Sequence, residues 1–342
     1  MSKMDSFKYM EDILLGPMRS RALLLAIKLQ IFELLQECPL TTQEISHRLK
    51  VKNTSMFAKL MHVLQCMNLI CFDGKTYCNS EITHAIFSSG QENNFAAFFC
   101  FLAEEIESRS TADLFFQIKE NQTPETPEVS FAEWQLYMQA MDDVAMLSAE
   151  VIAQTIDLKN MKTLCDMGSG PGTYAFAFAR TNPKLQITLF DVEPSLIIAK
   201  QNLADNKFSD QFQFVEGSVL DEDWGGPYDA IFLSHVIHLF RPTEVLHILQ
   251  TARRSLTSQG KLWIRDLFLN TEKTFPELGV LLSLCVWTEG GAYSKNLATY
   301  LLGQAGFDCV RYIKLDAAGQ FPKVVGNLLE ASTGHKKSTS QV

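Results

Sequence analysis

The sequence lacks the features that would place the protein against a nucleic acid or in a membrane. Its formal net charge is −9, whereas nucleic acids and anionic membranes attract basic surfaces. No run reaches about 18 uncharged apolar residues, so no membrane span is expected. Charges in the first turns argue against a secretory signal: Lys3, Asp5, Lys8, Glu11 and Asp12. We therefore expect a cytoplasmic protein with no nucleic-acid or membrane partner.

The cysteines and histidines give no sign of a disulfide or a metal site. None of the eight cysteines forms a C-x-x-C pair and most lie in apolar runs, which predicts buried free thiols in a reducing compartment. The seven histidines show no zinc spacing. His235 and His238 are three residues apart but have no third ligand nearby in the sequence. We expect no metal.

What is present is the composition of an ordinary globular protein, and residues 1–90 have the pattern of a winged helix. The chain is 46% hydrophobic and 20% charged, and its 342 residues suggest about two domains. Arg19–Gln36 predicts a helix that is apolar nearly all round. Thr41 and Glu44 predict a capping box, and Asn53 or Thr54 is expected to cap a third helix. The turn Asp73-Gly74 predicts a hairpin.

Winged helices often bind DNA, but this one has few of the cations that DNA binding needs. Its would-be recognition helix, residues 54–68, carries one lysine, one histidine and no arginine. Contacts with phosphates need several cations. We therefore interpret residues 1–90 as a dimerisation domain.

Residues 91–160 are expected to form a helical linker with pocket helices. A long helix is predicted over Phe131–Ile156, with an aromatic and methionine stripe on one side: Trp134, Tyr137, Met138 and Met141. This stripe is either plain core or the wall of an apolar pocket.

Residues 161–331 alternate apolar runs with helical patterns, which predicts an α/β domain with a mostly parallel sheet and helices on both faces. The polar residues 332–342 are expected to be a disordered tail. The expected strands are Thr163–Met167, Gln186–Asp191, Phe212–Glu216, Ala230–Ser234, Leu262–Leu267 and Asp308–Leu315.

The first two of these strands frame the most informative segment. Gly168, Gly170 and Gly172 follow the first strand, and Asp191 ends the second. Glycines allow a tight turn and a close approach to a ligand, and an acid at a strand tip can accept hydrogen bonds from ribose hydroxyls. This arrangement predicts an adenosine-containing cofactor, although a glycine turn alone would be only a structural feature of an α/β domain.

The spacing favours S-adenosylmethionine (SAM) over a dinucleotide. The loop departs from G-x-G-x-x-G, and Asp166 precedes it. A carboxylate there would repel a pyrophosphate but could receive a cationic amino group. SAM carries an ammonium and a sulfonium and has no phosphate.

Nearly the whole chain resembles the class I SAM-dependent O-methyltransferases of the plant caffeate, bacterial polyketide and acetylserotonin type. The resemblance rests on co-linear motifs, namely "LCDMGSGPGTYAFAFA", "FQFVEGSVLDEDWGGPYDAIFLSHVIHLF", "GGAYSKNLATYLLGQAGF" and the N-terminal winged-helix segment. It implies a Rossmann-like SAM-binding domain preceded by an all-α/winged-helix dimerisation domain, and therefore a homodimer.

The resemblance also implies roles for individual residues. Asp166 and the three glycines would hold the methionine part of SAM, and Asp191 the ribose. The further cofactor candidates are Val192, Gly217, Ser218, Val219 and Ser234, and Trp224 could lie near them. Ser218 stands where the family usually has an aspartate.

His238 falls at the position of the family's general base. The sequence around it departs from the plant pattern, because Leu239 and Phe240 replace Asp and Trp. Ala292 stands where the family has the glutamate that orients the base. The candidates for an orienting acid are therefore Glu272 and Glu289.

An aromatic, apolar acceptor pocket is expected from Trp134, Tyr137, Met138, Met141, Phe240 and Trp287, with Tyr9 and Met10 of a partner subunit as contributors. These residues suit a flat aromatic or polyketide acceptor. Two other interpretations stay open at this point. The protein could use bound SAM for pericyclic, decarboxylation or hydroxylation chemistry, or it could be a regulator that uses the winged helix.

Overall fold

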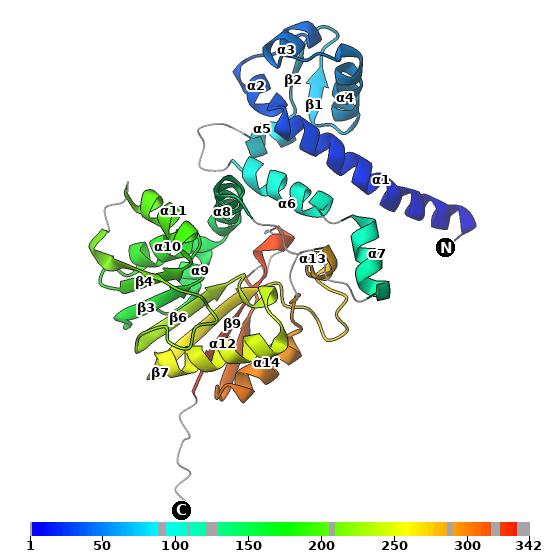
Figure 1. Ribbon diagram of the computed structural model, residues 1–342. Coiled ribbons are helices and arrows are strands. Elements are labelled where there is room, and N and C mark those ends of the chain that lie inside the picture. Colours follow the sequence, from blue (N-terminus) through cyan, green and yellow to red (C-terminus); the bar gives the residue numbers. More distant parts are fainter. Residues whose placement is uncertain are drawn as a thin grey trace, which may run out of the picture. The chain divides into compact units, whose positions relative to one another are not determined.

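The computed structural model describes residues 2–87, 94–108, 110–120, 129–204, 209–285, 290–315 and 322–333. The chain divides into two units, residues 1–110 and 111–342, and Figure 1 gives their elements. The segment 91–160, expected to be separate, is divided between them, because α6 packs on α1 in the first unit whereas α8 and α9 pack on α10 in the second. None of the helices in the described ranges is long and apolar enough to cross a bilayer.

The first unit is a winged helix followed by two more helices. Its elements are α1 (Lys3–Lys28), α2 (Ile31–Glu37), α3 (Thr42–Arg48), α4 (Thr54–Cys66), β1 (Ile70–Phe72), β2 (Tyr77–Asn79), α5 (Glu81–Phe87) and α6 (Ala96–Ser108). The predicted capping box is present, since Thr41 Oγ1 accepts from the Glu44 N–H and the Glu44 carboxylate accepts from the Thr41 N–H. Asn53 caps α4.

One predicted helix of this unit is interrupted. The expected helix over Arg19–Gln36 is shared between α1 and α2, and the break lies at Gln30, whose φ of 56° is left-handed. Helix α1 begins much earlier than predicted, at a capping box formed by Ser2 and Asp5.

The second unit is an α/β domain, and the expected fold class is confirmed. Its elements are α7 (Thr111–Glu120), α8 (Phe131–Met146), α9 (Ala149–Thr155), β3 (Thr163–Met167), α10 (Thr173–Thr181), β4 (Gln186–Asp191), α11 (Glu193–Ala204), η1 (Ser209–Gln211), β5 (Phe212–Glu216), β6 (Tyr228–Ser234), η2 (Ile237–Leu239), α12 (Pro242–Ser255), β7 (Leu256–Asp266), α13 (Glu277–Cys285), α14 (Lys295–Gln304), β8 (Cys309–Ile313), η3 (Lys323–Val325) and β9 (Asn327–Ser332).

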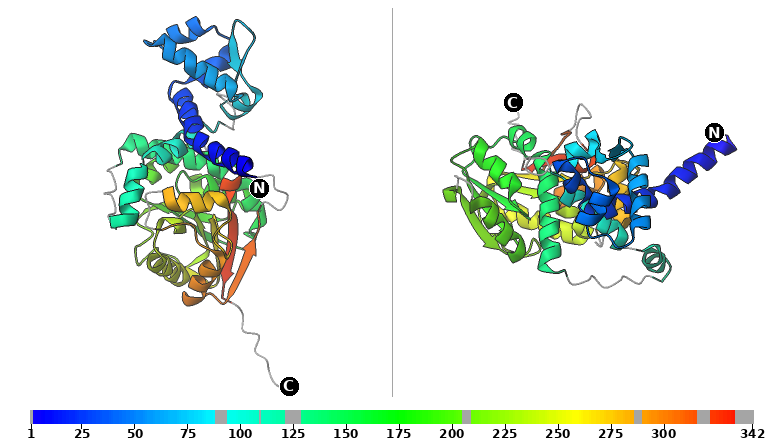
Figure 2. Two further views of the ribbon diagram at one scale, coloured as in Figure 1. Left: turned by 90° about the vertical axis from the view of Figure 1, so that its right-hand side faces the viewer. Right: turned by 90° about the horizontal axis from the view of Figure 1, so that it is seen from above.

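The strands form one sheet in the order β5-β4-β3-β6-β7-β9-β8, in which the first five are parallel and β9 runs antiparallel to both neighbours. Helices cover both faces (Figures 1 and 2). One core packs α12 and α14 against the sheet, and the other packs α9, α10 and α11. Because parallel strands end at the same edge, the ends of β3, β4, β6 and β7 lie side by side.

Strands β3, β4 and β5 have their predicted bounds, but other elements differ. Strand β9 was not predicted, and β7 begins earlier than expected, at Leu256. The long helix expected over Phe131–Ile156 is two helices, α8 and α9, with the break at Leu147 and Ser148. The tail expected to be disordered lies outside the described residues from position 334 onward.

The cysteines for which side chains are described are free thiols, as predicted. Their expected burial is wrong for most of them. Among the cysteines with described side chains, Cys165 alone is buried, Cys78 and Cys100 are half-buried, and Cys38, Cys66, Cys71 and Cys309 are exposed.

Candidate active site

A cavity of about 280 Å³ opens in the second unit, at the edge of the sheet where the parallel strands end. Helix α8 forms one wall, and the loops after β3, β4, β5, β6 and the end of β7 form the rest. Most of the predicted cofactor residues line it: Asp166, Gly168, Gly170, Asp191, Val192, Gly217, Ser218, Val219 and Ser234. Gly172 does not line the cavity.

The glycine loop has the backbone that only glycine adopts readily. Gly170 has a φ of 54°, and its N–H donates to Asp191 Oδ2 at 2.7 Å. Asp191 therefore ties the loop after β3 to the end of β4, and its Oδ1 accepts from the Val192 N–H at 2.7 Å. Gly172 is the N-cap of α10, with a φ of 87°, and a Cβ there would lie 2.8 Å from the Phe176 ring.

A buried acid, Asp166, and a half-buried one, Asp191, make the cavity favourable for a positively charged ligand. Burial, followed by repulsion from Asp191, raises the pKa of Asp166 well above its usual value. Burial also raises the pKa of Asp191, although the N–H groups of Gly170 and Val192 oppose this. A cationic ligand would stabilise both ionised carboxylates.

Several buried polar atoms of the cavity have no hydrogen-bond partner in the described structure. They include Asp166 Oδ2, Ser169 Oγ, Trp134 Nε1, His235 Nε2 and the Nε and Nη2 of Arg265. Buried polar groups are normally paired, so this set indicates a polar ligand. An ammonium, ribose hydroxyls and a carboxylate would satisfy these groups, and the residues therefore fit SAM.

The aromatic and methionine stripe of α8 does face the cavity. Trp134, Tyr137, Met138 and Met141 line it, and the first two rings pack edge to face with centroids 5.6 Å apart. Phe240 also lines the cavity. Trp287 falls outside the described residues. Trp224, which the sequence placed near the cofactor, is instead buried in the core beside α12.

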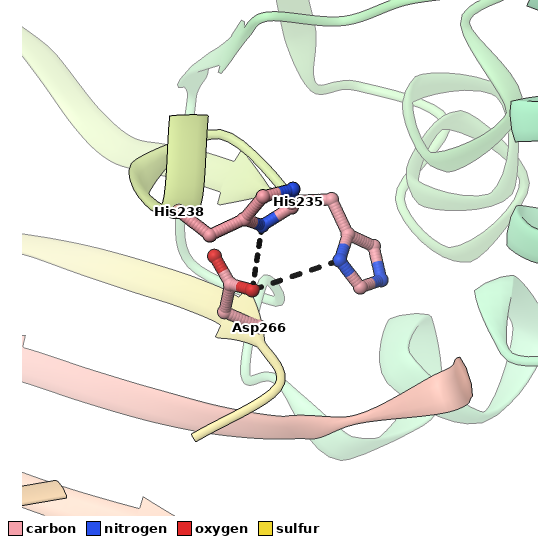
Figure 3. A group of neighbouring side chains, drawn as sticks. All are labelled: His235, His238 and Asp266. Carbon is pink, nitrogen blue, oxygen red and sulfur yellow. Dashed lines mark hydrogen bonds and ion pairs between the residues drawn. The ribbon is translucent and has the colours of Figure 1, made fainter. Parts of the chain in front are cut away.

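His238 lies on η2, directly after β6, and its partner is an acid at the end of the neighbouring strand. His238 Nδ1 is 2.8 Å from Asp266 Oδ1 (Figure 3). Burial alone would raise the pKa of Asp266, but the imidazoles of His238 and His235 outweigh it and hold that pKa well below its usual range. Because an ionised carboxylate only accepts hydrogen bonds, His238 Nδ1 carries the proton and Nε2 is left as the basic nitrogen.

The same carboxylate sets the protonation of His238. Burial would lower the pKa of His238, but the charge of Asp266 and the hydrogen bond to it outweigh burial, so this pKa lies above its usual value. The His238 side chain keeps 25% of its surface exposed. His238 is not among the residues that line the cavity, but Val236, two residues before it, and Leu239, directly after it, are.

The acid that orients His238 in the structure is Asp266, which was not among the candidates expected from the sequence. Glu272 is exposed, and the hydrogen bond of His238 goes to Asp266 instead. Glu289 lies outside the described residues. Asp266 could have been found in the sequence, because it lies within one residue of the end of the fifth expected strand, as Asp166 and Asp191 lie at or within one residue of the ends of theirs.

In the folded protein Asp266 lies beside His235 and His238, so the third potential metal ligand that was not evident near them in the sequence is present. His235 Nδ1 lies 3.7 Å from Asp266 Oδ1, and potential metal-ligand atoms of His235, His238 and Asp266 lie within 4.8 Å of one another (Figure 3). Burial, and then the nearby positive charge of Arg265, lower the pKa of His235 to about 4. Since the buried Arg265 guanidinium would also repel a divalent cation, we interpret this cluster as a hydrogen-bonded acid–base group.

Comparison with known families agrees with this geometry. Residues 120–308 match the family described as O-methyltransferase domain, and residues 11–88 match the O-methyltransferase dimerisation domain. The chain belongs to the O-methyltransferase family. It is a SAM-dependent O-methyltransferase with a dimerisation domain in its N-terminal part.

Individual relatives of this O-methyltransferase are distant but span its length. The acetylserotonin O-methyltransferase of Bos taurus is 26% identical over 326 residues, which cover 90% of this chain and 94% of that protein. The L-tyrosine C(3)-methyltransferase of Streptomyces lavendulae is 22% identical over 335 residues, 91% and 89% of the two chains. The crystal structure of human N-acetylserotonin methyltransferase in complex with SAM superposes with a TM-score of 0.78 at 22% identity, over 98% and 100% of the chains.

Proposed function

We propose that this O-methyltransferase transfers the methyl group to a hydroxyl of an aromatic or polyketide-like small molecule, with His238 as general base. The observation that carries the proposal is the His238–Asp266 pair beside a cavity walled by aromatic side chains. In the cofactor part of the site, Asp166 and the glycine loop would hold the methionine moiety and Asp191 the ribose.

In this mechanism His238 removes the proton of the acceptor hydroxyl at Nε2. Asp266 holds the ring by its Nδ1–H and stabilises the imidazolium that results. SAM supplies the electrophilic methyl group when it is bound. The aromatic walls align the acceptor and exclude water, so that the oxygen meets the methyl carbon in line.

The apolar wall supports an aromatic acceptor. Trp134, Tyr137 and Phe240 offer ring faces and edges for a flat molecule, and Met138 and Met141 adapt to its outline. The relatives named above act on acetylserotonin and L-tyrosine, both aromatic compounds.

The proposal includes a homodimer in the cytoplasm. The exposed apolar side chains of α1 support the dimer, because such a helix face is normally covered in solution. These side chains are Met4, Phe7, Met10, Ile13, Leu14 and Met18.

Free thiols support a reducing compartment. The contribution of Tyr9 and Met10 to a partner's pocket stays a prediction; both are exposed on α1.

The test is transfer from labelled SAM to a panel of phenols and hydroxylated polyketides, followed by mass spectrometry of the product. We expect an O-methyl product and one equivalent of S-adenosylhomocysteine (SAH). His238→Ala should leave SAH affinity within about twofold and reduce kcat by about 10²- to 10⁴-fold, the range of general-base catalysis. His62→Ala is the matched control, because His62 is exposed on α4 in the first unit, and it should keep full activity. A product without the methyl group, or a fully active His238→Ala, would refute the proposal.

A further inference from the structure

One charged residue of the cavity has no role in the mechanism above. Arg265 is the penultimate residue of β7 and lies beside Ser234, its register partner on β6. Its side chain is only 1% exposed, yet it lines the cavity. Nη1 donates to Ser234 Oγ at 3.1 Å, and the guanidinium carbon lies 5.5 Å from the centroid of the Tyr174 ring.

The guanidinium is incompletely paired. Its Nε and Nη2 have no hydrogen-bond partner, and no carboxylate among the described residues lies within the 4 Å of an ion pair. An arginine without an anion is unfavourable in a buried site. The free Nε and Nη2 present the fork of parallel N–H groups that matches the two oxygens of a carboxylate. This combination indicates a missing anionic ligand group.

The charged residues that line the cavity indicate which ligand group pairs with Arg265. Asp166 and Asp191 are acids, and His235 is neutral near pH 7, so Arg265 is the one fixed positive charge among the described lining residues. SAM brings an ammonium, a sulfonium and a single carboxylate. The acids suit the cationic groups and the ribose, which leaves the carboxylate to be matched.

We propose that Arg265 binds the carboxylate of the methionine moiety of SAM. The placement of its neighbours favours the cofactor over an acidic acceptor. Tyr174 lies in the first turn of α10, two residues after Gly172, and Ser234 ends the strand next to β3. Both neighbours of the guanidinium thus belong to the elements that frame the glycine loop, where the methionine part is proposed to lie. The inference rests on that placement of the cofactor.

The test compares two ligands that differ only by the carboxylate. Calorimetry would measure the Kd of SAH and of decarboxylated SAH, which keeps the amine, for the full-length wild type, Arg265→Met and Arg265→Lys. The matched control is Lys261→Met, which removes a positive charge from the same strand outside the cavity. Melting curves of the ligand-free proteins establish that each variant is folded.

The wild type should bind SAH about 10- to 150-fold more tightly than decarboxylated SAH, the range of a charge-assisted hydrogen-bonded pair. Arg265→Met should lose this preference by binding SAH more weakly, with little change for the decarboxylated ligand. Arg265→Lys keeps the positive charge but lacks the paired N–H groups of the guanidinium, so it should lose part of the preference for SAH. If Arg265→Met does not fold, the result for Arg265→Lys tests whether Arg265 binds the carboxylate. Lys261→Met should bind both ligands like the wild type.

Equal weakening of both ligands, or a wild type that does not distinguish them, would overturn the proposal. Unchanged SAH affinity in Arg265→Met, with a raised KM for a carboxylated acceptor but not for its methyl ester, would also overturn it and assign Arg265 to the acceptor. If instead neither protein binds SAH, the cofactor site itself has been misplaced, and that result refutes the proposed function as well.

Discussion

Asp266 controls two properties of His238, the position of its proton and its basicity. The hydrogen bond at Nδ1 leaves Nε2 as the base, while the negative charge raises the pKa of the ring. A stronger base is gained, but at the lower end of the neutral range a larger fraction of His238 is protonated and inactive. Turnover should therefore rise with pH through a pKa above about 6.5, the usual value for histidine.

Asp266→Asn should separate the two effects. Loss of the negative charge lowers the pKa of His238, so the acidic limb of the kcat–pH profile should move to lower pH. The plateau should also fall, by at least about tenfold, because an amide can hold the wrong tautomer. The measurement is kcat from pH 5.5 to 9 with SAM saturating. Glu272→Gln is the control, and a limb that stays in place in Asp266→Asn would contradict the assigned pair.

Asp166 should link cofactor binding to pH. Its raised pKa means that Asp166 of the free enzyme keeps its proton to a higher pH than an ordinary aspartate, and a bound ammonium would displace that proton. Binding then releases protons, so SAH affinity should increase as pH rises through the pKa of the free enzyme. Calorimetry in two buffers of different ionisation enthalpy measures the release directly. Asp166→Asn should bind more weakly and release fewer protons; proton uptake in the wild type would refute the assignment.

The loop after β3 is the element whose geometry depends most on residue type. Gly172→Ala would place a Cβ 2.8 Å from the Phe176 ring at a φ of 87°. We expect a loss of about 1–3 kcal/mol in the free energy of unfolding, measured with urea on the ligand-free enzyme.

The control is Gly303→Ala, because Gly303 lies in α14 and a Cβ there would meet nothing within 4 Å. It should increase stability by about 0.5–1 kcal/mol. A Gly172→Ala protein as stable as Gly303→Ala would show that the loop adopts another backbone.

The sequence predicted elements well where the local pattern and the tertiary environment agree. The apolar runs of β3 and β4 are buried on both faces, so their bounds could be read directly. Strand β9 inserts between β7 and β8, a neighbour relation that no local pattern reveals. The polar residues Thr257–Gln259 gave no strand signal, although they belong to β7.

The prediction of individual site residues from the sequence was limited in the same way. The glycine loop and its acids could be recognised because they are close in sequence or at regular strand ends. The pairing of His238 with Asp266, and the burial of Arg265, depend on β6 and β7 being neighbours. That adjacency brings together residues 28 positions apart, which spacing alone could not show.

The whole molecule is expected to be a dimer held in part by α1. Phe7 and Leu14 on this helix are 65% and 71% exposed. Burial of one such side chain contributes about 1.5–3 kcal/mol. Phe7→Glu and Leu14→Glu should therefore each raise the dimer dissociation constant by at least about tenfold, as measured by sedimentation equilibrium.

Met56→Glu is the control for the dimer prediction. Met56 is 58% exposed, but it lies on α4, the helix that would face DNA in a regulator. Its substitution should leave the dimer unchanged. Dissociation caused by Met56→Glu and not by the α1 variants would place the interface on α4.

The backbone around His238 is held by residues 290–293, whereas the aromatic and methionine wall of the acceptor pocket is on α8. A Cβ at Gly290 would lie 2.2 Å from the His238 carbonyl oxygen, the Gly291 N–H donates to that oxygen at 2.8 Å, and the Tyr293 hydroxyl donates to the Phe240 carbonyl at 2.7 Å. The α8 side chains that face the cavity have no part in this clamp. Evolution, or a library that randomises α8, can therefore explore new acceptors while the base stays in place, so chemistry and selectivity are separately evolvable in this enzyme.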